Sequence, residues 1–95
     1  MNAPSTPQRL DRAAIEALLR QALEPLELEV RDDSHLHAGH AGAREGGHFH
    51  VRIVSGRFAG LTRPARHRLV YDALGSLAAR GIHALAIDAR TPQDG

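Results

Sequence analysis

The sequence has 95 residues, 42% of them hydrophobic, and a formal net charge of +1 at pH 7, which suits one small domain with a single core. The nearly balanced charge argues against a strong general attraction to nucleic acid. The absence of cysteine excludes disulfides, cysteine-based zinc sites and thiol catalysis by this chain. No apolar run approaches membrane-spanning length, and residues 1–9 lack the apolar stretch of a signal peptide, so a cytoplasmic location is expected.

The N-terminal third predicts a lead-in, a helix and a strand. Residues 1–8 are polar and contain two prolines, which is typical of a disordered segment. A helix is then expected between Asp11, a plausible N-cap, and Pro25, because apolar residues recur at helical spacing: Ile15, Leu18, Leu19, Ala22 and Leu23. Leu26, Leu28 and Val30 alternate with charged residues, which predicts a half-buried strand.

Five of the seven histidines lie between Asp32 and Val51. A loop is expected over residues 33–47, and its length is more typical of a functional segment than of a simple hairpin turn. Imidazole binds borderline metals, so His35, His37 and His40 are candidate ligands, although solvated side chains explain the spacing equally well.

A second strand follows this loop. Phe49, Val51 and Ile53 form its inward set, which places His48 and His50 on the opposite face. These two histidines are either a chelating pair or part of a polar, solvated face, and the solvated face is the more common case.

After a break at residues 55–60, a second helix is expected from near Thr62 or Ala65 to Ala79, with Gly81 just past its end. Residues 82–89 predict the last strand, and the tail from residue 91 is polar and expected to be loose. By alternation, His83 is expected to share a face with Leu85 and Ile87.

A basic cluster surrounds the start of the second helix and comprises Arg63, Arg66, His67 and Arg68. Positive charge is unfavourable there against the helix dipole, so an anion or acidic partner would compensate it. A solvated basic face is the alternative. The sequence contains no phosphate-binding loop, dinucleotide fingerprint, zinc-protease motif or nucleophile elbow, and it predicts no enzyme.

The element order helix, strand, strand, helix, strand predicts the fold class. The first two strands should pair antiparallel, and a right-handed crossover should place the third parallel to the second. Both helices then cover one face of a three-stranded mixed sheet, which is a two-layer α+β sandwich.

Several sequence blocks occur in the order typical of one family. They are Asp33-Ser34-His35-Leu36-His37, His48-Phe49-x-Val51-x-Ile53-Val54-Ser55, Arg57-Phe58-x-Gly60, Arg66-His67-Arg68-x-Val70-Tyr71 and Gly81-Ile82-His83-Ala84-Leu85-Ala86-Ile87. Together they resemble the BolA family over residues 9–91, with residues 1–8 as the lead-in and 92–95 as a flexible tail. The resemblance implies a fold similar to class II KH domains.

The resemblance also implies a function and a ligand set. BolA-like proteins pair with monothiol glutaredoxins in iron–sulfur and iron handling, and the heterodimer can hold a bridging two-iron two-sulfur cluster. The glutaredoxin and glutathione supply thiolates, and the BolA-like chain supplies histidine. By this resemblance His83 is a cluster ligand and His37 is the loop ligand. His40 is an alternative to His37, because this loop is longer and richer in histidine than is usual in the family.

We therefore expect a non-enzymatic glutaredoxin partner, monomeric or weakly dimeric when alone. The alternative is a DNA-binding transcriptional regulator of the BolA type that uses Arg63, Arg66 and Arg68. A third hypothesis is a metal-binding module that acts alone through the loop histidines.

Overall fold

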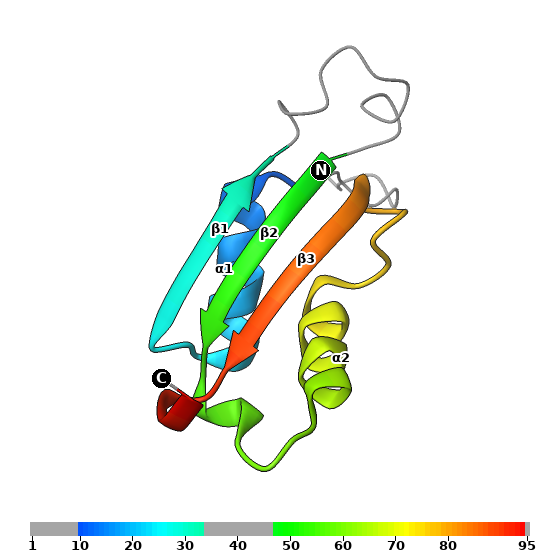
Figure 1. Ribbon diagram of the computed structural model, residues 1–95. Helices are drawn as coiled ribbons and strands as arrows, with labels where there is room; N and C mark the ends of the chain where they lie inside the picture. Colours follow the sequence, from blue (N-terminus) through cyan, green and yellow to red (C-terminus); the bar gives the residue numbers. More distant parts are fainter. Residues whose placement is uncertain (1–9, 34–46, 95) are drawn as a thin grey trace, which may run out of the picture.

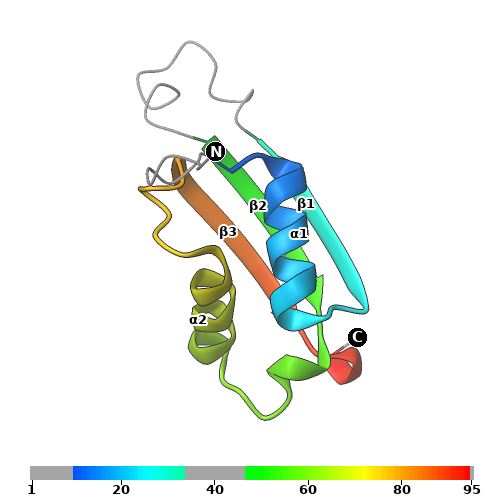
Figure 2. The same cartoon turned by 180° about the vertical axis from the view of Figure 1, so that it is seen from behind.

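The computed structural model describes residues 10–33 and 47–94. Two α-helices lie on one face of a three-stranded sheet, and the other face carries no helix among the described residues (Figure 1). The view from behind in Figure 2 shows α1 lying across β1 and β2, with α2 beside β3. The predicted two-layer α+β class and the order α-β-β-α-β are confirmed. Residues 1–8, predicted as a disordered lead-in, lie outside the described residues.

Helix α1 (Arg12–Leu23) begins and ends where the sequence predicts. The Asp11 carboxylate accepts a hydrogen bond from the backbone N–H of Ala14 at 2.8 Å, which satisfies one of the unpaired donors of the first turn. The helix buries one apolar stripe, Ile15, Leu19 and Leu23. It stops before Pro25, which disfavours helical geometry at the preceding residue.

The sheet has the order β1 (Glu27–Asp32), β2 (Gly47–Val54), β3 (Ile82–Arg90). β1 pairs antiparallel with β2, and β2 pairs parallel with β3, as predicted. The inward set of β2 is also confirmed, since Phe49, Val51 and Ile53 are buried. Leu26 differs from the prediction. It precedes β1 and its side chain is 71% exposed, so the buried set of β1 begins only at Leu28.

Helix α2 (Arg63–Leu74) starts in the predicted region but ends five residues before Ala79. Gly75 ends it, with a φ of 82°, a backbone conformation that favours glycine. Leu77 lies in the turn after the helix and still packs against the core. Its apolar side chain therefore fits the helical spacing in the sequence, although the residue is not in the helix. Gly81 has a positive φ of 78°, as is typical of a glycine just past a helix end, but it follows this turn rather than the helix itself.

The core lies between the sheet and the two helices. Its largest fully buried side chains include Phe58, from a short 3-10 helix over Gly56–Phe58, and Ile15 and Leu19 from α1. Buried Ser55 links the end of β2 to the end of α1, because its hydroxyl donates to the carbonyl of Leu23 at 2.6 Å. No helix of the described residues is long and apolar enough to cross a membrane.

Candidate functional site

His83 lies at a break in the β2–β3 ladder. Gly47 pairs with Ile82 and His48 pairs with Ala84, so His83 is the extra residue of a β-bulge. Ile82 is buried, Leu85 packs against the core, and both His83 and Ala84 between them are exposed. The prediction that His83 shares a face with Leu85 and Ile87 is therefore wrong, because the bulge interrupts the alternation on which it depended.

The bulge brings His83 to His48 on the neighbouring strand. Their ring centroids are 5.0 Å apart and the two ring planes are inclined by 49°. His48 alternates with buried Phe49, so it belongs to the face of β2 that carries no helix. The sequence placed the two histidines on different faces and did not predict this contact. Nothing in strand periodicity signals a bulge at this point.

The segment that holds the other candidate ligands is attached beside this pair. Its flanking residues are Asp33, whose N–H donates to the carbonyl of His48 at 2.7 Å, and Gly47, whose N–H donates to the carbonyl of Gly81 at 2.8 Å. The loop candidates His35, His37 and His40 lie outside the described residues. Within residues 10–33 and 47–94, no group of three histidine, aspartate or glutamate side chains is placed to hold a metal ion.

The predicted basic cluster lies at the other end of β3. An open groove of about 760 Å³ runs between α2 and the last residues of β3, and Arg63, Arg66, His67 and Arg90 are among the residues that line it. Ala89, at this end, is six residues beyond His83, which is roughly 20 Å at the rise of a β-strand. The two candidate sites are therefore spatially separate.

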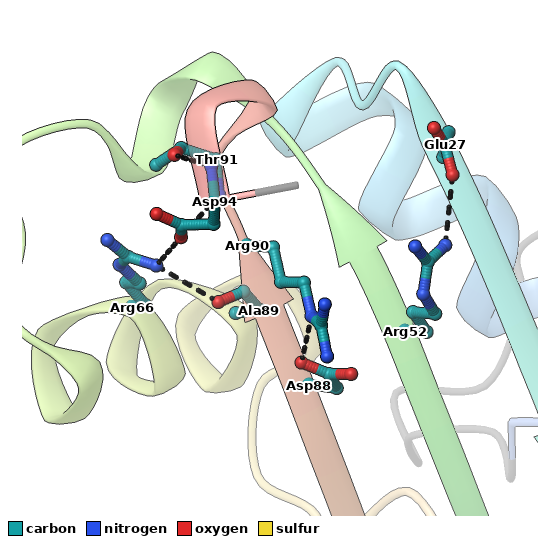
Figure 3. A network of polar contacts seen from close by, with 8 residues as sticks. All are labelled: Glu27, Arg52, Arg66, Asp88, Ala89, Arg90, Thr91 and Asp94. Carbon is teal, nitrogen blue, oxygen red and sulfur yellow. Dashed lines mark hydrogen bonds and ion pairs between the residues drawn. The ribbon is translucent and has the colours of Figure 1, made fainter.

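Arg66 has a structural role in this groove. Its guanidinium donates to the carbonyl of Leu61 at 3.0 Å. It also donates to the carbonyl of Ala89 at 3.2 Å and to the carboxylate of Asp94 at 2.5 Å (Figure 3). Arg63 and Arg68 are exposed, so they are better placed than Arg66 to meet an anion.

Asp94 belongs to a part of the chain that was predicted to be a flexible tail. Residues Pro92–Asp94 form a 3-10 helix, and Thr91 is buried. The backbone N–H of Thr91 donates to the Asp94 carboxylate at 3.0 Å (Figure 3). This bond, followed by the one from Arg66, lowers the pKa of Asp94 to about 2. The sequence offered no signal for this arrangement beyond the polar character of the segment.

Asp88 and Arg90 form a second ion pair on this part of β3. Arg90 Nε donates to the Asp88 carboxylate at 2.9 Å (Figure 3), and this bond is the main reason that the pKa of Asp88 is lowered. Asp94 and Asp88 thus neutralise Arg66 and Arg90. Of the cations that line the groove, Arg63 has no carboxylate within ion-pair distance among the described residues.

The fold and the paired histidines define the chain as a small two-layer α+β domain with imidazoles gathered at one end of its sheet. A family model described as "BolA-like protein" matches residues 19–94. The chain belongs to the BolA-like family.

Two curated relatives and one solved structure illustrate the likeness. BolA-like protein 1 of Mus musculus is 51% identical over 80 residues, which are 84% of this chain and 57% of the mouse protein. The DNA-binding transcriptional regulator BolA of Escherichia coli (strain K12) is 41% identical over 80 residues, covering 84% of this chain and 74% of that protein. The solved BolA domain of SufE1 from Arabidopsis thaliana is 46% identical with a TM-score of 0.77, covering 88% of this chain and 94% of that one.

Proposed function

We propose that this chain is a non-enzymatic partner of a monothiol glutaredoxin, with which it shares a bridging two-iron two-sulfur cluster in iron–sulfur assembly, trafficking or iron regulation. The observation that carries the proposal is the position of His83 at the bulge, where the residue is exposed on the surface of the domain. Membership of the BolA-like family supports it. A cytoplasmic location stays a prediction.

The residues present fit a shared cluster better than a resident one. The chain has no thiolate to offer, and its described part brings together two imidazoles but no third ligand. Imidazole can replace thiolate at one iron of such a cluster, where it raises the reduction potential. His83 would hold the cluster from this side, and His37 or His40 would complete the histidine contribution. A ligand shell divided between two proteins can be taken apart, which suits cluster transfer.

The experiment mixes the full chain with a monothiol glutaredoxin, glutathione, iron and sulfide. We expect a coloured heterodimer whose visible absorption and circular dichroism change sharply in the His83→Ala variant. His50→Ala is the matched control, because it removes a half-buried histidine from the open face of β2. Unchanged spectra in a folded His83→Ala heterodimer would contradict the ligand assignment, and the absence of any heterodimer would contradict the partnership.

A second candidate function is DNA binding. The observation in its favour is the groove beside α2, where Arg63 has no carboxylate within ion-pair distance among residues 10–33 and 47–94. A relative in Escherichia coli also carries the name of a DNA-binding regulator. With a net charge of +1, we expect weak and mostly non-specific binding. Arg63→Ala and Arg68→Ala should each reduce the dependence of affinity on salt. Tight, sequence-selective binding at physiological salt would make this the main function.

A further inference from the structure

The outer edge of β1 differs from the other edge of the sheet, which is formed by β3. Arg66 covers the carbonyl of Ala89 on the β3 edge, whereas no helix of the described residues lies outside β1 (Figures 1 and 2). We propose that β1 binds a second copy of this chain, and that the two copies pair antiparallel about Val30 to form one continuous sheet. This dimer concerns the chain alone and needs neither a glutaredoxin nor a metal.

The first argument is the direction of the backbone groups of β1. In an antiparallel ladder, residues alternate between those whose N–H and C=O bond to the neighbouring strand and those whose groups point away from it. The N–H of Asp33 donates to the carbonyl of His48 on β2, so the backbone groups of Arg31 and Glu29 also point to β2. Those of Val30, which lies between them, therefore point outward. If Val30 faces its own copy across a two-fold axis, the two residues can exchange both backbone hydrogen bonds.

The second argument is the charge along this edge. Because Val30 is buried against the helices, Glu29 and Arg31 on either side of it lie on the open face of the sheet. Antiparallel pairing about Val30 places Glu29 of one copy directly opposite Arg31 of the second copy, and the two-fold axis repeats the contact. The Cα atoms of such a pair, which shares no backbone hydrogen bond, come within about 4.5 Å. Opposite charges in directly opposing positions stabilise a pair of strands.

The third argument is that both side chains are available for this contact. Glu29 forms no hydrogen bond or ion pair with any residue in 10–33 and 47–94. Arg31 donates to the Asp33 carboxylate through Nε at 2.8 Å and Nη2 at 3.2 Å, which leaves Nη1 to donate to a second carboxylate. Its side chain is 59% exposed. With a net charge of +1, two copies repel each other little.

The same charges select the alignment of the two strands. A two-fold axis at Glu29 would place two glutamates directly opposite each other, and an axis at Arg31 would do the same with two arginines. Like charges in these positions destabilise both alignments. Val30 is therefore the favoured centre. Because β1 has only six residues, the contact is small and the dimer should be weak.

The experiment is analytical ultracentrifugation of the full chain over a range of concentrations, with far-UV circular dichroism of each variant to show that the fold is kept. Glu29→Arg and Arg31→Glu each place like charges opposite each other, so each should raise the Kd of the dimer by about ten-fold or more. A mixture of the two variants restores both opposite-charge contacts, and it should dimerise at least as tightly as the unchanged chain. Arg68→Glu on exposed α2 is the matched control: it alters the net charge as Arg31→Glu does and should change Kd by less than about two-fold.

Hydrogen exchange of the backbone amides tests the alignment in the unchanged chain. The N–H of Val30 should become more protected as the protein concentration rises, whereas the N–H groups of Glu29 and Arg31, which already bond to β2, should change little. If the chain stays monomeric at the concentrations used for NMR, the proposal is wrong. It is also wrong if Glu29→Arg dimerises as tightly as the unchanged chain, or if the mixture of variants does not restore the dimer, because the copies then meet at another surface.

Discussion

Replacing Arg66 with alanine should destabilise the fold strongly, although the residue lies in the basic cluster. Its guanidinium donates to the carbonyls of Leu61 and Ala89, and only 18% of its side chain is exposed. Hydrogen bonds from a charged donor contribute about 1.5–3 kcal/mol each. Because the groove is open and water can replace the lost donor, we take about 1–1.5 kcal/mol for each of the two bonds, at or below the lower end of this interval. Leaving the solvent-screened pair with Asp94 out of the sum, we expect a loss of about 2–3 kcal/mol.

The assay is urea unfolding followed by far-UV circular dichroism. For a domain of this size the free energy of unfolding falls by about 1–1.5 kcal/mol per molar urea. The midpoint of urea unfolding should therefore fall by roughly 2 M. Arg68→Ala is the control, because Arg68 is exposed on the same helix and its loss should change stability by no more than about 0.5 kcal/mol. If the two variants unfold at the same urea concentration, Arg66 does not hold the groove together.

Three further predictions concern the core, the C-terminal turn and the loop. Phe58→Ala should cost about 3–5 kcal/mol in chemical unfolding, because Phe58 is completely buried; a loss below about 1 kcal/mol would mean that the site collapses around the gap. Because the pKa of Asp94 is lowered in the folded chain, its carboxylate stabilises the fold fully at pH values above the ordinary pKa of 3.8. This contribution to the free energy of unfolding should be lost as the pH falls through about 2. Asp94→Asn should make the stability less dependent on pH in this range, measured as unfolding by acid. An acid-unfolding curve of the same shape as that of the unchanged chain would contradict the prediction. His37→Ala should shorten the lifetime of the shared cluster under a chelator more than His40→Ala, with His35→Ala nearly silent. If the cluster of the His40→Ala variant has the shortest lifetime of the three, His40 is the loop ligand.

Strand periodicity and helix boundaries predicted most of the fold. The alternation around Phe49 fixed which face of β2 is buried, and Asp11 and Pro25 marked both ends of α1. These signals are local, and each reflects a physical requirement of one element. The predicted end of α2 failed because Gly75 interrupts a helix whose apolar pattern continues into Leu77. One glycine with a positive φ outweighed a favourable hydrophobic spacing.

The candidate site was harder to predict, because its geometry depends on contacts between elements. A single extra residue in β3 moves His83 to the neighbourhood of His48, and strand alternation cannot anticipate a bulge. The structural role of Arg66 likewise depends on the carbonyl of Ala89 and on Asp94, both more than twenty residues away in the sequence. Residue types indicated imidazole chemistry and a basic cluster at the start of the second helix, whereas the groove and the pairing of particular side chains required the folded chain.

The bond from Arg66 to Ala89 also affects the exposed edge of the sheet. β3 is an edge strand, and exposed backbone groups along such an edge are a template for a strand from another molecule. The carbonyl of Ala89 is occupied by a guanidinium, and the Pro92–Asp94 turn is fastened to the same group, so an incoming strand meets a charged side chain at this position. A chain without Arg66 would therefore be expected not only to unfold more readily but also to aggregate from the native state.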